Sequence, residues 1–247
     1  MNNQLDIVFN STMVSSALSA AYELGIIEQL HQKNTIAIDT FCQENNLHQP
    51  SVKAIVLALC SFDICQLNDN NNIVQQGLLF RDAYRYKGYF LWLIRGYGYL
   101  LQNLASIAKN ENRYNDFIKR DGKYIALAGR DYGQLFEDSY FEELLEEFPY
   151  KFVADLGCGS AAKLINIVKK SPEVRGIGVD INTGAVKTAQ TAVDNAELQA
   201  RIKIVEGDIS KLENQPEFNE VDVVFSFFNG HDIWPRNNCF KYLQNLH

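Results

Sequence analysis

Apolar and polar residues alternate at helical spacing through the N-terminal part of the chain. This spacing predicts an amphipathic helix over residues 8–30, with a break at Gly25. Two shorter helices are expected at residues 36–45 and 51–63. Two short apolar runs on either side of an Asp/Asn-rich turn predict a hairpin over residues 65–76. Three helices followed by a hairpin indicate a winged-helix domain, which we class as all-helical.

The middle of the chain continues the helical pattern. Residues 80–110 are rich in Tyr, Phe and Leu and predict long helices, and residues 136–148 predict an amphipathic helix. We therefore expect a winged-helix domain over residues 1–110 and a helical linker over residues 111–149 that caps a binding pocket. A homodimer is expected, because aromatic side chains on several helices would otherwise leave a large apolar patch exposed.

At Tyr150 the pattern changes to short apolar runs that alternate with helical segments. Strands are expected at residues 152–156, 175–179, 202–206 and 221–227, and helices at residues 161–170 and 183–196. This alternation predicts an α/β domain over residues 150–247, built on a parallel sheet with helices on both faces. Ligands of such sheets bind at the carboxyl ends of the strands.

Composition and charge exclude several classes of function. Hydrophobic residues make up 47% of the chain and charged residues 21%, as in globular proteins. The net charge of −7 without a basic run argues against nucleic acid and acidic membrane surfaces as partners. No secretory signal or membrane-spanning run is recognisable. Five cysteines without a CxxC pair indicate reduced thiols, so we expect a soluble cytoplasmic protein.

The strongest chemical signal follows the first expected strand of the α/β domain. Gly157 and Gly159 let the backbone turn sharply and approach a ligand closely. Asp180 ends the second strand, where its carboxylate can accept both hydroxyls of a ribose. Asp208 ends the third strand, within reach of an adenine amino group. Acidic residues at successive strand ends indicate a nucleotide-like cofactor.

Two cofactors compete for this arrangement. NAD favours a third glycine two residues after Gly159, and this chain has Ala161 there. Asp155 lies just before the glycines, and its negative charge is unfavourable beside a pyrophosphate. Its carboxylate suits a methionine-like amine and a sulfonium cation instead.

Three segments carry a resemblance to a known family: D-L-G-C-G-S at residues 155–160, G-V-D-I at 178–181 and E-G-D-I at 206–209. They resemble the first three motifs of class I S-adenosylmethionine-dependent methyltransferases, which implies a Rossmann-like sheet. The N-terminal domain resembles that of small-molecule methyltransferases that dimerise through it. The cofactor-binding residues that this resemblance implies are Asp155, Gly157, Gly159, Asp180, Ile181, Asp208, Ile209 and Phe228.

The segment N-G-H-D at residues 229–232 has three interpretations. His231 and Asp232 are a base with its neighbour, a pair of metal ligands, or a helix cap at Asp232. The segment resembles methyltransferases that bind iron or another divalent metal and C-methylate α-keto acids, and related domains of polyketide assembly lines. That resemblance implies His231 and Asp232 as ligands and a small-molecule or carrier-bound acyl substrate. Arg130, in the segment that should cover the pocket, is the candidate partner for a substrate carboxylate.

Two other functions remain open on the sequence. The chain is an O-methyltransferase with His231 as its base, or an inactive scaffold with a methyltransferase fold. Only four strands of the expected sheet are readable, so we expect a chain truncated at its C-terminus and a metal site that is absent or weak here.

Overall fold

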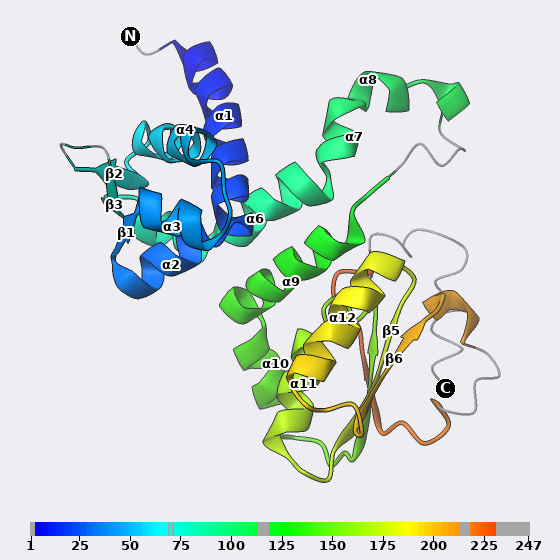
Figure 1. Cartoon of the computed structure of the whole chain (residues 1–247). Helices are drawn as coiled ribbons and strands as arrows, with labels where there is room; N and C mark the ends of the chain where they lie inside the picture. The colour runs from blue at the N-terminus through cyan, green and yellow to red at the C-terminus, as the bar shows by residue number, and fades with distance from the viewer. Residues whose placement is uncertain (1–2, 69, 71, 113–118, 213–217, 231–247) are drawn as a thin grey trace. The chain divides into compact units, whose positions relative to one another are not determined.

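The chain forms two compact units, residues 1–119 and 120–247, in the computed structural model. The structure describes residues 3–68, 70, 72–112, 119–212 and 218–230 (Figure 1). None of the helices in these ranges is both long and apolar enough to cross a membrane.

The first unit begins with four helices and a small sheet. Its elements are α1 (Gln4–Glu23), α2 (Ile26–Lys33), β1 (Thr35–Ala37), α3 (Ile38–Glu44), α4 (Gln49–Cys60), β2 (Cys65–Leu67) and β3 (Ile73–Gln76). The expected break at Gly25 is confirmed, since its φ of +81° separates α1 from α2. The expected hairpin is confirmed by antiparallel pairing of β2 with β3.

One strand of this unit was not expected. β1 pairs antiparallel with β3, so the sheet has the order β1-β3-β2. The helix expected over residues 36–45 therefore begins only at Ile38. Three residues are too few to show a strand periodicity, and β1 is defined by its partner in the sheet. The domain that we classed as all-helical thus contains a three-stranded sheet.

The prediction of long helices over residues 80–110 is wrong, because the helices of this segment are short. The segment consists of α5 (Phe80–Arg85), α6 (Lys87–Leu91), the π-helical turn η1 (Trp92–Gly96), α7 (Gly98–Gln102), α8 (Leu104–Ile107) and the 3₁₀ turn η2 (Asn110–Asn112). Gly96 and Gly98 lie at the ends of η1 and α7. Glycine lowers helix propensity by about 1 kcal/mol relative to alanine, which favours interruptions at these points.

The second unit is an α/β domain that starts with two helices. Its elements are α9 (Gly122–Phe136), α10 (Asp138–Leu145), β4 (Phe152–Leu156), α11 (Ala162–Lys170), β5 (Arg175–Asp180), α12 (Thr183–Asn195), β6 (Ile202–Glu206), the 3₁₀ turn η3 (Ile209–Lys211) and β7 (Val223–Phe225). The expected parallel sheet is confirmed, with the order β6-β5-β4-β7. The helix expected over residues 136–148 is α10, which ends at Leu145, and α9 precedes it. Both helices belong to the unit that begins at Arg120.

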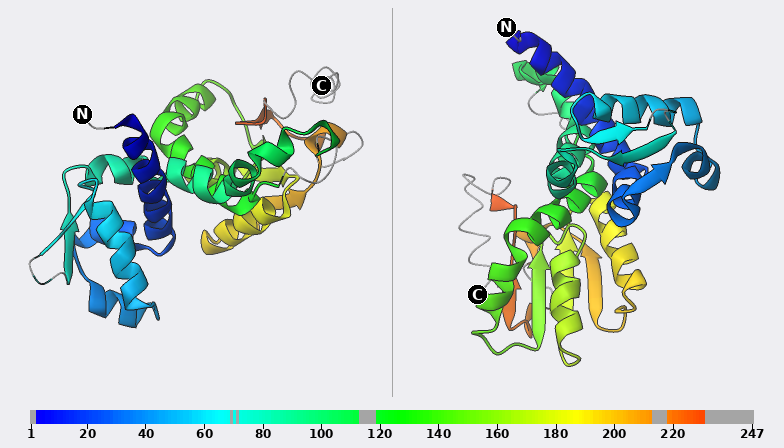
Figure 2. Two further views of the ribbon diagram at one scale, coloured as in Figure 1. Left: turned by 90° about the horizontal axis from the view of Figure 1, so that it is seen from above. Right: turned by 90° about the vertical axis from the view of Figure 1, so that its left-hand side faces the viewer.

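The two faces of this sheet pack differently. Val153 and Phe225 pack against residues of α10, α11 and α12 on one face. Leu156 and Val179 face the other way and pack with Leu212 from the segment after β6. In the described part of this unit, α10, α11 and α12 lie over the first face (Figure 2), and α9 packs chiefly against α12 and α10. The carboxyl ends of the four strands meet at one edge, as parallel pairing requires.

Candidate functional site

The loop after β4 is held tightly against β5. The amides of Gly157 and Cys158 both donate hydrogen bonds to the carbonyl oxygen of Val179, at 2.7 and 2.9 Å. Gly157 and Gly159 have φ values of +78° and +55°, in the left-handed region that favours glycine. The sharp turn expected from the sequence is therefore confirmed.

Ala161 repeats this conformation without being a glycine. Its φ is +57° and its side chain is fully buried at the N-terminus of α11. A left-handed backbone costs an L-residue roughly 1–2 kcal/mol. Its amide donates to the carbonyl oxygen of Cys158 at 2.7 Å. The backbone at position 161 thus keeps a conformation typical of glycine although the residue there is an alanine.

Asp180 joins the loop to the end of β5. One carboxylate oxygen accepts the Gly159 amide at 3.0 Å, and the other accepts the Asn182 amide at 2.9 Å. Burial raises the pKa of Asp180, and these two hydrogen bonds act in the opposite direction. A carboxylate has about four lone-pair positions, so two acceptor positions remain for a ligand.

Asp155 lies in β4 below the loop and is almost completely buried. Burial raises its pKa to about 7; the charge of Lys163 lowers it and that of Asp180 raises it. Lys163 itself is nearly buried and forms ion pairs with Asp138 at 2.6 Å and Glu137 at 3.2 Å. The region therefore contains an acid whose charge responds to pH near neutrality.

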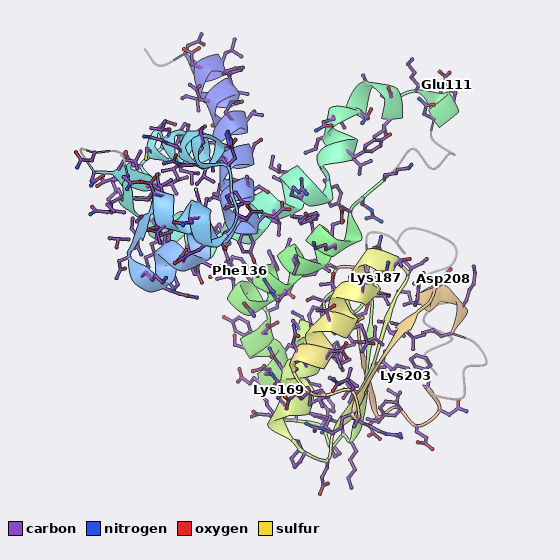
Figure 3. All side chains as sticks on the ribbon, viewed as in Figure 1. Glu111, Phe136, Lys169, Lys187, Lys203 and Asp208 are labelled. Carbon is purple, nitrogen blue, oxygen red and sulfur yellow. The ribbon has the colours of Figure 1, made fainter. Side chains whose placement is uncertain are left out.

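The third acidic residue lies at the carboxyl end of β6 (Figure 3). Asp208 is partly exposed and forms an ion pair with Lys211 at 3.3 Å. Ile181 is 68% exposed beside the end of β5, and Ile209 is partly buried. The ends of β5 and β6 therefore present an exposed apolar side chain, Ile181, together with the carboxylates of Asp180 and Asp208.

Phe228 lies just after β7 and is half exposed. Its ring contacts Tyr132 of α9 edge to face, with 5.0 Å between the centroids, and Tyr132 also contacts Phe136. The φ of Phe228 is +60°, a strained value for an aromatic residue. The sequence did not indicate Tyr132 as part of this region.

Helix α9 lies against the loop after β4. The Cα and Cβ atoms of Ala126 are 3.7 Å from the position that a Cβ on Gly159 would occupy. A Cβ on Gly122 would collide with the side chain of Asn182, and one on Gly133 would collide with Lys163. Glycine at these two positions allows α9 to approach α11 and α12 closely. The sequence predicted a helical cover here but not the bounds of α9.

Asn229 makes hydrogen bonds at the end of β4 that the sequence does not reveal. Its side-chain amide donates to the carbonyl oxygen of Leu156 at 2.6 Å and to Ser226 Oγ at 2.9 Å. Ser226 Oγ also donates to that carbonyl at 2.8 Å. The sequence shows Asn229 only as part of the N-G-H-D segment, because only the fold brings this residue beside β4.

The remaining predicted residues are not brought together by the described structure. Arg130 forms an ion pair with the buried Asp131 at 2.8 Å, and its role toward a substrate carboxylate stays a prediction. His231 and Asp232 lie outside the described residues. Within the described ranges, no three His, Cys, Asp or Glu side chains form a group that could hold a metal ion.

Comparison with known proteins adds independent information. A family model described as a methyltransferase domain matches residues 153–247. The methyltransferase ungE' of Aspergillus campestris is 34% identical over 241 residues, which cover 97% of this chain and 70% of that protein.

Solved structures share the fold at low sequence identity. A putative O-methyltransferase from Nostoc punctiforme superposes with a TM-score of 0.63 at 13% identity, covering 98% of this chain and 75% of that one. Human N-acetylserotonin methyltransferase, solved in complex with SAM, gives 0.60 at 17% identity, covering 98% and 74%. Both units of this chain therefore have counterparts in proteins of one architecture.

Proposed function

Because the chain belongs to the class I S-adenosylmethionine-dependent methyltransferases, we propose that the carboxyl edge of the sheet β6-β5-β4-β7 binds S-adenosylmethionine. The family indicated by the three sequence motifs is thus confirmed. The observation that carries the residue assignment is the bond from the Gly159 amide to Asp180, which makes the glycine loop and the second-strand acid one unit.

Each side chain at this edge has a proposed role. Asp180 accepts the ribose hydroxyls through its two remaining acceptor positions. Gly157 and Gly159 let the backbone contact the methionine part of the cofactor, and Asp155 offers its carboxylate to the ammonium group. The side chains proposed to flank the adenine are Ile181, Asp208 and Ile209.

The methyl group is proposed to point toward Phe228. The quadrupole of an aromatic ring attracts a cation within about 6 Å, and a sulfonium is a cation. Half of Phe228 is exposed, which leaves ring surface for such a contact. Its edge-to-face contact with Tyr132 supports a fixed orientation of the ring.

The proposed methyl acceptor is a small metabolite or a carrier-bound acyl group. His231 and Asp232 follow Phe228 in the chain, so we propose that they act on the acceptor. Two transfers are compatible with these residues: C-methylation beside a keto group, assisted by a divalent metal, or O-methylation with His231 as base. His231 and Asp232 would hold the metal, which would polarise the keto oxygen of the acceptor, and both residues lie outside the described ranges.

Calorimetry with S-adenosylmethionine, S-adenosylhomocysteine and NAD tests the proposed site. S-adenosylmethionine and its demethylated product S-adenosylhomocysteine should bind, and NAD should not. Binding of NAD, or absence of binding by both S-adenosyl compounds, would contradict the proposal. Labelled S-adenosylmethionine with an α-keto acid or a phenol then separates C- from O-methylation, and His231→Ala should abolish either. Binding without transfer to any acceptor would instead support the inactive scaffold.

A homodimer is proposed for the first unit. The N-terminal half of α1 exposes Leu5, Ile7, Val8, Phe9 and Met13. An exposed apolar patch of this kind is typical of a surface that binds another protein chain. Light scattering at micromolar concentration should give a dimer, and the variant Val8→Glu/Phe9→Glu a monomer. A monomeric wild-type chain would contradict this.

A further inference from the structure

The glycine loop is held from two sides, and only one of them is the cofactor-binding strand. In the sheet order β6-β5-β4-β7, β4 lies between β5 and β7. The β5 side supplies the carbonyl of Val179, which binds the amide of Gly157. The β7 side supplies the segment Ser226–Asn229, which contacts the end of β4 at Leu156.

The hydrogen bonds on the β7 side use the full donor capacity of one amide. The side chain of Asn229 carries two N–H hydrogens. It donates to the carbonyl oxygen of Leu156 at 2.6 Å and to Ser226 Oγ at 2.9 Å. That carbonyl also accepts the Ser226 hydroxyl at 2.8 Å, so the three groups form a closed triangle. An aspartate of the same shape would set a carboxylate oxygen against the Leu156 carbonyl.

Gly157 provides the space that this amide occupies. A Cβ on Gly157 would collide with the Nδ2, Cγ and Oδ1 atoms of Asn229. The glycine therefore serves two purposes, a left-handed φ of +78° and room for a side chain from the strand beyond. Asn229 in turn closes the side of Gly157 that β5 does not contact.

The turn that delivers Asn229 is itself strained. Phe228 has a φ of +60°, and such a backbone persists where its surroundings hold it. Its ring contacts Tyr132 on one side, and the next residue is fixed by the Leu156 carbonyl on the other. Strain of this kind is typical of sites that need a fixed geometry.

We propose that Asn229 is a positioning residue for the cofactor: its amide holds the Leu156 carbonyl and closes the side of Gly157, and so fixes the loop that contacts the methionine part of the cofactor. The inference rests on the proposed function, because it assigns a role to a residue that does not itself bind the cofactor. Asn229 links the loop after β4 to Phe228, so one side chain sets the relative position of the cofactor loop and the aromatic ring.

Calorimetry on matched variants tests this role. Asn229→Ala and the isosteric Asn229→Asp should each bind S-adenosylmethionine about tenfold more weakly, the effect of losing one well-placed hydrogen bond. Ser226→Ala should have a smaller effect, since Asn229 still holds the carbonyl. Asn195→Ala and Asn195→Asp, on an exposed position at the end of α12, are the controls and should bind normally.

A kinetic readout separates positioning from a general loss of stability. In turnover, the KM for S-adenosylmethionine should rise about tenfold in Asn229→Ala, while kcat and the KM for the acceptor stay near those of the wild type. A thermal midpoint for each variant shows that it is folded at the assay temperature. The inference is wrong if Asn229→Ala lowers the thermal midpoint and changes kcat and the KM of both substrates. The role of Asn229 would then be structural.

A double-mutant cycle tests whether Asn229 acts through Gly157. Gly157→Ala should cost less affinity in the Asn229→Ala background than in the wild type, because the added methyl no longer meets the amide. Additive losses would overturn the inference, and so would equal affinity of Asn229→Ala and wild type. A wild-type chain that binds no S-adenosylmethionine would contradict the proposed function as well.

Discussion

The Nζ atom of Lys163 on α11 lies 2.6 Å from the Oδ1 atom of Asp138 at the start of α10. Glu137 is 3.2 Å from the same ammonium, and all three side chains are largely buried. The positive charge of Lys163 also acts on Asp155, the buried acid beneath the glycine loop. A structural ion pair and a proposed cofactor contact thus share one cation.

Binding of S-adenosylmethionine should depend on pH through Asp155. Its pKa is raised to about 7, so the carboxylate is charged above that pH and neutral below it. A neutral acid attracts the cofactor ammonium weakly. The affinity for S-adenosylmethionine should therefore be highest above neutrality. Below neutrality it should fall by up to about tenfold for each unit by which the pH decreases. Calorimetry across this range measures it.

Asp155→Asn is the control for this pH dependence. The amide cannot ionise, so the variant should bind weakly at every pH and give a flat profile. A profile for Asp155→Asn that still falls below neutrality would assign the titration to another group.

Lys163→Met should move the same pH profile upward. Without the ammonium, burial and Asp180 alone act on Asp155, and its pKa rises further. Unfolding should also become easier by about 1–3 kcal/mol, because Asp138 and Glu137 lose their partner. The midpoint of the binding profile and the thermal midpoint are the measurements.

Lys151→Met is the matched control for Lys163→Met. Lys151 pairs with Glu173 at 3.7 Å with both side chains more than 70% exposed, so little should change. Lys163→Arg keeps the charge and should retain the pH midpoint. A midpoint that moves equally in all three variants would refute the link between Lys163 and Asp155.

Asp180→Ala should weaken binding of S-adenosylmethionine by about one to two orders of magnitude. A hydrogen bond to a charged group contributes about 1.5–3 kcal/mol, and the variant also frees the Gly159 amide. Asp194→Ala, on an exposed position of α12, should bind like the wild type. Unchanged affinity in Asp180→Ala would remove Asp180 from the cofactor site.

Gly157→Ala should reduce both stability and binding. Alanine at a φ of +78° costs about 1 kcal/mol or more, and its methyl group meets Asn229. Gly129→Ala is the control: no atom lies within 4 Å of its added methyl, and alanine favours the helix by about 0.5–1 kcal/mol. Thermal melts and calorimetry should therefore show opposite signs of stability change, with binding lost only in Gly157→Ala.

The strands of the second unit were predictable for a clear physical reason. Parallel strands inside a sheet are buried on both faces, so β4 and β5 read as short apolar runs. The edge strand β6 is only partly buried, and it is recognised by its β-branched residues and by the Gly-Asp that follows it. The positions of Gly157, Asp180 and Asp208 follow directly from the strand ends. Local sequence suffices here because the same residues that form each strand also mark its end.

Helix α9 and Asn229 depended on tertiary structure instead. Glycines at positions 122, 129 and 133 weaken the helical signal of α9. A Cβ at Gly122 would collide with the side chain of Asn182 and one at Gly133 with the end of the Lys163 side chain, which no local pattern reveals. Asn229 is separated from Leu156 by 73 residues. The sequence by itself determined the strands, the glycine loop and the acids at its edge. Only the packing of distant segments decided which side chains hold that loop, because a contact of this kind exists only once the sheet has formed.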